Sequence, residues 1–326
     1  MKYRPLGKTG IIVSEIGFGT WGLGGNAYGP VDDGVSVQAL QAAFDQGITF
    51  FDTSDLYGDG RSEEVLGRAL HDVRESVVIC TKIGLLPHKG FSIPYDFSPQ
   101  YIRQGIQDSL RRLKTDYVDL YLLHSPTIDF LEKHPETLEV MTELQEAGLI
   151  RSYGVSVRSP ADGIMAVQQF DVAAIEVNFN LIDQRAIENG LFELAQRVQA
   201  GIIVRTPLCF GYLTGQLRGD EQFEGIDHRA NWPTGQLQRW AEAPEYFSSL
   251  AESRNSTISQ LALRFCLDQE SISTVIPGMM NAEQVLENAV SSQLECLTDE
   301  EKTQIHHIYQ ANSFYDKNAK QESLSA

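Results

Sequence analysis

Four polar side chains in this sequence are of types that together can carry out acid–base chemistry. Asp52, Lys82 and His124 each end an apolar run, and Tyr57 follows Asp52 by five residues. A tyrosine hydroxyl, with a pKa of about 10, is a poor acid or base at neutral pH. A nearby ammonium favours the phenolate, so we expect Lys82, kept charged by Asp52, to lower the pKa of Tyr57. With His124 orienting a carbonyl oxygen, this layout suits carbonyl reduction, in which hydride reaches carbon and a proton reaches oxygen.

Simpler interpretations exist for each residue alone. Asp52 and Lys82 could form a structural ion pair, and His124 could be a satisfied histidine at a rim. Lys82 could be the Schiff-base lysine of a barrel lyase, but that chemistry gives Tyr57 no clear role. The joint placement of the four residues favours carbonyl reduction.

These residues need a fold that gathers the ends of several strands. Helical periodicity, for example at 102–113 and 187–198, alternates with eight apolar runs, which lie at 16–19, 48–53, 77–82, 118–124, 150–156, 173–179, 201–206 and 273–278. This alternation is typical of parallel strands joined by crossover helices. Eight units predict an α/β fold, a single closed (β/α)8 TIM barrel, with an open doubly wound sheet as the alternative. Active sites of such barrels lie at the carboxyl ends of the strands.

Further segments complete the predicted domain, which spans residues 1–311. Residues 2–13 read as an N-terminal β-hairpin. The segment 207–248, after strand 7, is a long aromatic loop, and loops of this length are usually functional. A capping box at 298–301 opens a C-terminal helix, and residues 312–326 look like a polar, frayed tail.

Composition limits the partners. The net charge is −18, with 26 basic and 44 acidic residues, which disfavours nucleic acid and anionic membranes but not a small phosphorylated molecule. The N-terminus lacks the apolar region of a signal peptide, and no apolar run approaches the ~18 residues of a membrane span. The scattered cysteines contain no C-x-x-C pair, so we expect a cytoplasmic protein with reduced thiols and no metal site. The oligomeric state is not predicted.

One glycine motif is misleading. Residues 17–22, GFGTWG, match the G-x-G-x-x-G dinucleotide fingerprint. That fingerprint requires a helix to open within the glycines, whereas LGGNAYGPVDDG follows. We therefore interpret the match as accidental.

Several motifs in order resemble the aldo-keto reductase superfamily over nearly the whole chain. They are LGKTGIIVSEIGFGTW, FFDTSDLYGDGRSEEVLG, TK at 81–82, LKTDYVDLYLLHSP, GLIRSYGVS, LTG at 213–215 and IPGMMNAEQVLEN. The resemblance implies a (β/α)8 barrel that reduces a small carbonyl compound with NADP(H), or possibly NAD(H). It implies that Tyr57 is the general acid, that Lys82 and Asp52 tune it, and that His124 positions the substrate.

The resemblance also implies a cofactor stretched across the barrel mouth. The nicotinamide end would meet Gly19, Thr20, Trp21 and Ser156, and the pyrophosphate would meet the segment from Leu213 to Gly215. The loop containing Gly278 would meet the phosphates, and Gln284 and Asn288 would hold the adenine. Segments 84–97, 125–130 and 207–248 would form the pocket walls.

Five positions depart from the common pattern of this family. Val157 stands in place of an Asn, Glu176 in place of a Gln, and Arg205 in place of an aromatic residue. Gln216 stands in place of a Lys, and Met280 in place of an Arg. Because Glu176 and Arg205 end adjacent runs, we predict that they pair, with the guanidinium beneath the nicotinamide. The alternative is a solvated rim pair without cofactor contact. The resemblance leaves a second function open, a cofactor-binding regulatory subunit with slow or no turnover.

Overall fold

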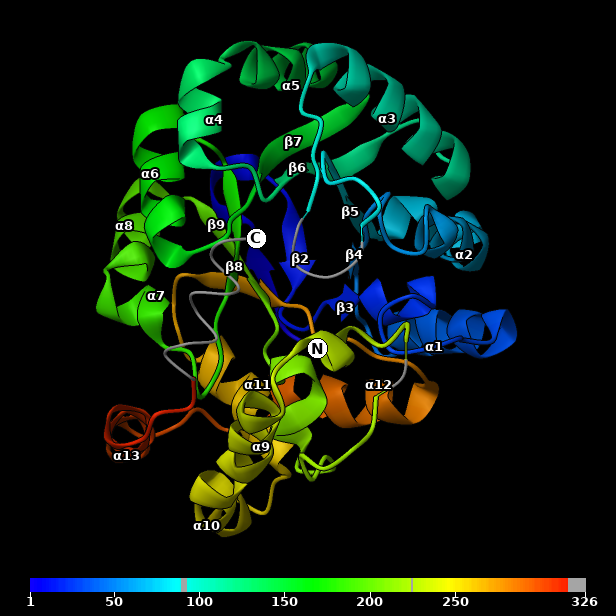
Figure 1. The fold of residues 1–326 in the computed structure, drawn as a ribbon. Coiled ribbons are helices and arrows are strands. Elements are labelled where there is room, and N and C mark those ends of the chain that lie inside the picture. The colour runs from blue at the N-terminus through cyan, green and yellow to red at the C-terminus, as the bar shows by residue number, and fades with distance from the viewer. Residues whose placement is uncertain (89–92, 224, 316–326) are drawn as a thin grey trace.

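The computed structural model describes residues 1–88, 93–223 and 225–315 (Figure 1). Its parallel sheet runs in the order β10-β9-β8-β7-β6-β5-β4-β3. Parallel bridges from Ile16 to Val275 and from Gly19 to Gly278 join the first strand to the last. The predicted (β/α)8 barrel is therefore confirmed. The strands are β3 (Phe18–Gly19), β4 (Phe50–Asp52), β5 (Val78–Ile83), β6 (Val118–His124), β7 (Ile150–Ser156), β8 (Ala174–Asn178), β9 (Gly201–Arg205) and β10 (Ile272–Val275).

Helices surround the strands (Figure 1). Ser98, Ser159 and Thr298, the last of them in the predicted capping box, each accept a hydrogen bond from a backbone N–H of the helix that follows. The helices are α1 (Asp33–Asp45), α2 (Arg61–Ala69), α3 (Pro99–Leu113), α4 (Ile128–Lys133), α5 (Glu136–Glu146), α6 (Pro160–Phe170), α7 (Arg185–Glu188), α8 (Leu191–Val198), α9 (Thr234–Glu242), α10 (Ser248–Ser253), α11 (Ile258–Leu267), α12 (Ala282–Ala289) and α13 (Asp299–Ala311).

One predicted helix is divided in two. The apolar periodicity predicts a single helix over 187–198, but α7 and α8 are separated at Gly190, whose φ is 80°. That left-handed conformation suits glycine and interrupts the helical backbone. Gly190 is the N-cap of α8, and the side chain of Asn189 accepts a hydrogen bond from the N–H of Leu191 at 3.1 Å.

The predicted hairpin closes one end of the barrel. Strands β1 (Tyr3–Pro5) and β2 (Ile12–Ser14) pair antiparallel, and Leu6, Ile11 and Val13 pack into a core cluster with strand residues such as Phe50 and Leu120. Full burial of one such side chain contributes about 1.5–3 kcal/mol. The hairpin is thus an apolar plug in the barrel.

A buried ion pair holds this plug in place. Arg4 Nε donates to Glu15 Oε1 at 2.7 Å, and Ser292 Oγ donates to Glu15 Oε2 at 3.1 Å. The other guanidinium nitrogens of Arg4 donate to the carbonyls of Ile272 and Leu267, both at 2.8 Å. Strand β1 is thereby hydrogen bonded to Ile272, the first residue of β10, and to Leu267, which precedes that strand.

The described residues of the long segment 207–248 are rich in aromatic side chains and include α9 and the first residue of α10. Trp240 and Phe247 are fully buried, and Phe314 packs against Phe247 with ring centroids 6.4 Å apart. Gln236 also donates from Nε2 to the carbonyl of Phe314 at 2.8 Å. The expected tail therefore begins with residues that pack onto this segment, while its remainder, 316–326, lies outside the described residues.

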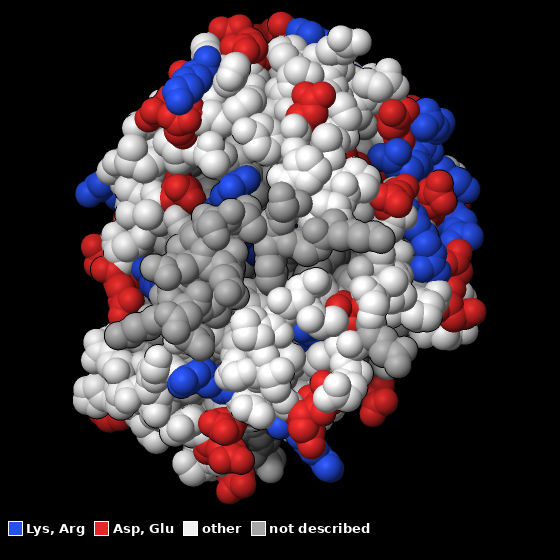
Figure 2. Space-filling model, in the orientation of Figure 1, with Lys and Arg blue, Asp and Glu red and all other residues white. Residues whose placement is uncertain are grey.

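Charged side chains are mixed on the face drawn in Figure 2, where basic groups gather beside α2 and α3 among acidic ones. Many of these arginines are already paired: Arg61 and Arg68 with Asp33, and Arg112 with Glu63. In the described part of the chain, no helix is long and apolar enough to cross a membrane.

Candidate active site

The candidate catalytic residues meet at the carboxyl ends of the strands. The parallel register places Gly19 beside Asp52, Lys82 beside Leu122, and His124 beside Ser156. Tyr57 lies between β4 and α2, in a turn that begins directly after Asp52. A short local segment thus carries Tyr57 back over the strand ends, which brings all four predicted residues to one place.

The ammonium of Lys82 is the centre of this arrangement. Lys82 Nζ donates to both carboxylate oxygens of Asp52 at 2.6 Å, to the carbonyl of Thr53 at 3.0 Å and to Tyr57 Oη at 3.4 Å. Lys82 is fully buried and Asp52 is 2% exposed. Buried charges persist when they are paired and hydrogen bonded, and here the pairing also fixes the ammonium against the tyrosine hydroxyl.

Glu176 gives Lys82 a second carboxylate partner. Glu176 Oε2 lies 3.3 Å from Lys82 Nζ, and Glu176 is 1% exposed. Ser156 Oγ donates to Glu176 Oε1 at 2.8 Å. The hydroxyl of Ser156 was expected at the nicotinamide carboxamide. In this structure it is already hydrogen bonded to Glu176, on the neighbouring strand β8.

The predicted pairing of Glu176 with Arg205 is confirmed. Arg205 Nε lies 3.7 Å from Glu176 Oε1, and Arg205 Nη2 donates to the carbonyl of Val157 at 3.1 Å. Glu176 is buried whereas the Arg205 side chain is 28% exposed, and the contact of this pair with a nicotinamide stays a prediction. Asp52, Glu176, Lys82 and Arg205 together form a cluster whose formal charges cancel.

Two atoms of this cluster are unsatisfied. Glu176 Oε2 and Arg205 Nε are buried and have no hydrogen-bond partner among the residues that the structure describes. Both atoms still take part in ion pairs, Glu176 Oε2 at 3.3 Å from Lys82 Nζ and Arg205 Nε at 3.7 Å from Glu176 Oε1, so their charges are paired although they make no hydrogen bond. Such atoms beside Lys82 mark a place where a bound polar group could complete the site, and a nicotinamide carboxamide is a group of that kind.

The expected lowering of the Tyr57 pKa is wrong. Burial raises the pKa of Tyr57 above its ordinary value, and the opposing effect of Lys82 is too small to reverse this. The cause is the dry environment of the hydroxyl, which disfavours a phenolate. Tyr57 is therefore a neutral hydroxyl near pH 7, which suits a proton donor.

Burial and neighbouring charges act in opposite directions on the two partners of the ion pair. Burial alone would lower the pKa of Lys82, but Asp52 and Glu176 raise it well above its ordinary value. Burial raises the pKa of Asp52 in turn, against the pull of the ammonium and with the help of the Glu176 charge. The lysine therefore remains a cation at any pH at which an enzyme works.

His124 faces Tyr57 on one side and a polar pair on the other. The rings of Tyr57 and His124 are 6.1 Å apart at 81°, and Ser54 Oγ lies 3.3 Å from His124 Nδ1. Ser54 also donates to Asp55 Oδ1 at 3.0 Å. The sequence analysis missed Ser54 and Asp55, although the polar pair directly after Asp52 in DTSD was a usable signal.

The residues expected at the nicotinamide end differ in how free their side chains are. Thr20 Oγ1 donates to the carbonyl of Asp52 at 2.8 Å and accepts from Ser62 at 2.6 Å, so its side chain holds the framework together. Trp21 instead stands beside Tyr57, with ring centroids 6.4 Å apart. At Gly19, a Cβ atom would approach the carbonyl of Ile276 to 2.9 Å, so the backbones are close there.

The residues expected at the phosphates and adenine follow strands β9 and β10. Leu213 is fully buried, Gly215 has a φ of 73°, and a Cβ atom on Gly278 would meet open space. Gln284 Oε1 accepts from the N–H of Met280 at 2.8 Å. Asn288, on the same helix α12, is buried. Gly278 bridges Gly19, so the loop with Gly278 adjoins the nicotinamide end.

Aromatic residues of the segment 207–248, which was predicted to form a pocket wall, pack against Trp21. His228 packs on Trp21 with ring centroids 4.5 Å apart, and on Phe210 at 4.8 Å. Burial lowers the pKa of His228 to about 4, so the ring is neutral. Of the expected pocket walls, residues 89–92 and 224 lie outside the described residues.

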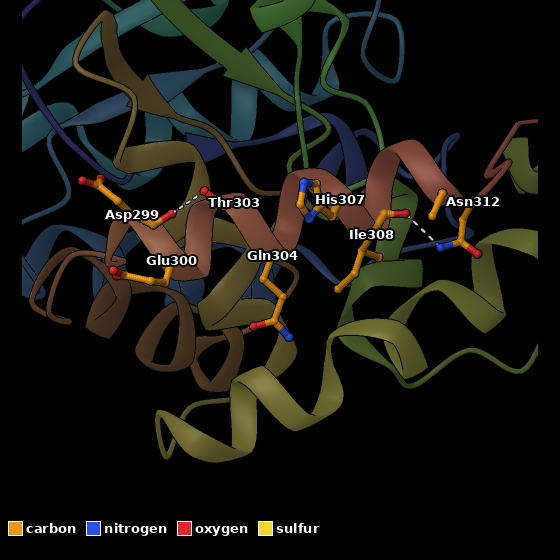
Figure 3. A pocket seen from close by; sticks show the side chains of 8 residues that line it. Asp299, Glu300, Thr303, Gln304, His307, Ile308 and Asn312 are labelled. Carbon is orange, nitrogen blue, oxygen red and sulfur yellow. Dashed lines mark hydrogen bonds between the residues drawn. The ribbon is translucent and has the colours of Figure 1, made fainter.

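A surface groove along α13 has, among its described lining residues, no set of side chains comparable to the one at the strand ends. This groove of about 670 Å³ follows α13 and is lined by side chains that include Asp299, Thr303 and His307 (Figure 3). Its lining residues that the structure describes contain no lysine or arginine. Across 1–88, 93–223 and 225–315, no cluster of three or more His, Cys, Asp or Glu side chains could hold a metal ion. The strand ends, and not this groove, carry the reactive constellation.

Known proteins share this fold and sequence pattern. The chain is 36% identical over 295 residues to the aldo-keto reductase YhdN of Bacillus subtilis, covering 86% of this chain and 87% of that one. It is 31% identical to an NADH-specific methylglyoxal reductase of Escherichia coli, covering 95% and 99% of the two chains.

Solved structures agree with the sequence relatives. The holo form of the aldo-keto reductase AKR11C1 from Bacillus halodurans superimposes with a TM-score of 0.78 at 30% identity, covering 98% of this chain and 99% of that one. An aldo/keto reductase of Klebsiella pneumoniae in complex with NADP and acetate gives 0.71 at 28% identity, covering 97% and 99%. The model of the Aldo/keto reductase family matches residues 15–310. The chain therefore belongs to the aldo/keto reductase family of oxidoreductases.

Proposed function

We propose that this enzyme reversibly reduces a small aldehyde or ketone to an alcohol with NAD(P)H. One observation carries the proposal: the buried ammonium of Lys82, held by Asp52 at 2.6 Å, contacts the hydroxyl of Tyr57 at 3.4 Å. An ion pair that served only the fold would have no need of a third, ionisable group at the mouth of the barrel. A proton donor fixed in this way suits chemistry that delivers a proton to oxygen.

The chain's own residues supply the acid–base half of the reaction. The bound nicotinamide supplies or accepts the hydride. Tyr57 donates its hydroxyl proton to the carbonyl oxygen in reduction and takes it back in oxidation. Lys82 stabilises the phenolate that remains, and Asp52 keeps the ammonium oriented. His124, whose ring faces Tyr57, hydrogen-bonds the same oxygen and fixes the carbonyl between them.

For the cofactor we propose contacts from the predicted rim. Trp21, Glu176 and Arg205 would meet the nicotinamide end, and Leu213, Gly215, Gly278, Gln284 and Asn288 the phosphates and adenine. The unsatisfied atoms Glu176 Oε2 and Arg205 Nε support the first part. The open space beside Gly278 supports the second, because a backbone without a side chain lets a phosphate approach closely.

The choice between NADPH and NADH is less strongly determined by the residues. The family resemblance favours NADP(H), whereas Gln216 and Met280 place no positive charge where a 2′-phosphate would bind. Among the proteins named above, the Escherichia coli relative is described as NADH-specific and the Klebsiella pneumoniae structure contains NADP. We propose NADP(H) as the favoured cofactor and NAD(H) as the alternative.

The test is a titration of the purified chain with NADPH and with NADH, followed by oxidation of the bound cofactor with a panel of aldehydes and ketones. We expect quenching of protein fluorescence by at least one cofactor and turnover with at least one carbonyl. Lys82→Met serves as the control, since it removes the ammonium and should stop turnover. Tight binding with no turnover on any carbonyl would instead identify a regulatory subunit.

A further inference from the structure

A chain of hydrogen bonds connects His124 to a carboxyl group outside the proposed catalytic set. Ser54 Oγ lies 3.3 Å from His124 Nδ1 and 3.0 Å from Asp55 Oδ1. The backbone N–H of Leu56 donates to Ser54 Oγ at 3.2 Å. Ser54 is fully buried, His124 is 9% exposed, and Asp55 is partly buried. The three side chains are thus positioned to exchange hydrogen bonds.

When the proton of a neutral Asp55 lies on Oδ1, the oxygen that contacts Ser54, this chain has two arrangements. A serine hydroxyl has one hydrogen and two lone pairs, and one lone pair already accepts from Leu56. In the first arrangement, a protonated Asp55 donates to Ser54, Ser54 donates to His124 Nδ1, and the ring hydrogen is on Nε2. In the second, His124 Nδ1–H donates to Ser54, Ser54 donates to ionised Asp55, and Nε2 carries a lone pair.

The ring of His124 is neutral in both arrangements. Burial holds its pKa well below the ordinary value, and the charges of Lys82, Arg205 and His88 lower it further. A neutral imidazole has one donor nitrogen and one acceptor nitrogen, and the hydrogen bond at one nitrogen decides which is which. The partner of Nδ1 therefore decides what Nε2 offers on the other side of the ring.

We propose that Asp55 is a positioning residue that sets the tautomer of His124 through Ser54. The inference rests on the proposed function only for the statement that Nε2 faces the substrate oxygen. Protonated Asp55 leaves an N–H at Nε2, which can donate to a carbonyl oxygen. Ionised Asp55 leaves a lone pair there, which repels that oxygen. The change releases one proton to solvent, and no bond between heavy atoms is made or broken.

The surroundings of Asp55 place this change near neutral pH. Burial, followed by the charge of Glu63 on α2, raises the pKa of Asp55 to about 7. Ser54, the N–H of Leu56 and the Arg112 guanidinium oppose the rise. The other titratable groups that face Asp55 are Tyr101 of α3 and Tyr121 of β6, both of them neutral hydroxyls.

The experiment is nuclear magnetic resonance of the full chain labelled with ¹⁵N-histidine, because ¹⁵N shifts distinguish the two neutral tautomers. Loss of one ring signal in His124→Gln assigns it. We expect the wild-type ring to change from the Nε2–H to the Nδ1–H tautomer with a midpoint near pH 7. Asp55→Asn and Ser54→Ala should abolish the pH-dependent change. Asp59→Asn, which alters an exposed carboxylate of the same turn, should leave it intact.

Two results would overturn the inference: a His124 signal that does not change tautomer between pH 5.5 and 8.5 in the wild type, or an unchanged transition in Asp55→Asn. Kinetics supply a second measurement. For reduction, kcat/KM should fall roughly tenfold per pH unit above the midpoint in the wild type, as expected when one protonated group is required. The fall should be much shallower in Asp55→Asn.

The two proposals can fail separately. A tautomer transition in a protein that reduces no carbonyl would contradict the proposed function and leave the role of Asp55 standing. Turnover without the transition would contradict the role of Asp55 alone.

Discussion

Two glutamate–arginine pairs at different places on the barrel, each with a buried glutamate and a partly exposed arginine, are built in opposite ways. Beside the hairpin, both carboxylate oxygens of Glu15 accept hydrogen bonds, and Arg4 also donates to backbone carbonyls. At the mouth, Glu176 Oε2 and Arg205 Nε lack hydrogen-bond partners within the described parts of the chain, and the pair is 3.7 Å apart. The first pair is complete without any ligand, and the second is not.

The two pairs differ in hydrogen bonding. Removing one partner from a pair at a buried carboxylate leaves a charge uncompensated. Atoms that lack hydrogen bonds, as at the mouth, can accept a contact from a polar group that binds there. We therefore expect changes beside the hairpin to affect unfolding and changes at the mouth to affect turnover and cofactor affinity.

The largest expected effect is on turnover at the mouth. Tyr57→Phe removes the proton donor and should lower kcat by a factor of about 100 to 10,000, the usual contribution of general acid–base catalysis. Because the ring remains, cofactor affinity and the unfolding midpoint should stay near those of the wild type. Stopped-flow oxidation of NAD(P)H with an accepted carbonyl gives the rate. Wild-type kcat in this variant would refute the role of Tyr57.

The next effect is on stability beside the hairpin. Glu15→Ala leaves the Arg4 guanidinium without its carboxylate and should lower the free energy of unfolding by about 3 kcal/mol. Urea denaturation followed by circular dichroism measures this. Activity per folded molecule should be unchanged at low temperature. If Glu15→Ala reduced kcat without destabilising the chain, the division between the two pairs would be wrong.

A smaller effect concerns pH. Asp55 has a raised pKa in the folded chain, so its stabilising contribution is present at low pH and is lost as pH rises toward 7. Between pH 5.5 and 8.0 this loss should amount to about 2 kcal/mol in the wild type. Asp55→Asn, which cannot ionise, should remove it, so its unfolding free energy should exceed that of the wild type at pH 8.0. A loss of the same size in both proteins would contradict this.

The smallest effect is a coupling at the mouth. Glu176→Gln and Arg205→Gln, alone and together, form a double-mutant cycle for cofactor affinity measured by fluorescence titration. Neighbouring charged residues commonly couple by about 1 kcal/mol, and we expect a value of this size if the pair contacts the nicotinamide. A coupling of zero would mean that the pair does not sense the cofactor.

Much of this architecture was predictable from the sequence because it depends on local patterns. Apolar runs with a polar last residue predicted both the strands and the meeting of Asp52, Lys82 and His124, since parallel strands place their carboxyl ends on one face. The same reasoning predicted the Glu176–Arg205 pair. The roles of these residues stay proposals.

Other features depend on the complete packing. The direction of the Tyr57 pKa shift follows from how fully the hydroxyl is enclosed, which spacing along the chain does not reveal. The contact of Ser54 with His124 joins residues 70 apart in the sequence and depends on side-chain direction. The break between α7 and α8 was different, because Asn189-Gly190 is a recognisable interruption that apolar periodicity outweighed.

The plug formed by the hairpin also has a consequence for synthesis of the chain. Arg4 donates to a carbonyl 268 residues further along, and contacts between such distant residues are slow to form. The first strands of the barrel are thus made long before the segment that anchors the hairpin. Until that segment is made, the hairpin that carries Leu6, Ile11 and Val13 is not anchored to it. A nascent chain with exposed apolar side chains is a substrate for chaperones. Closure of the barrel is therefore a late event that ends the period of greatest risk of aggregation.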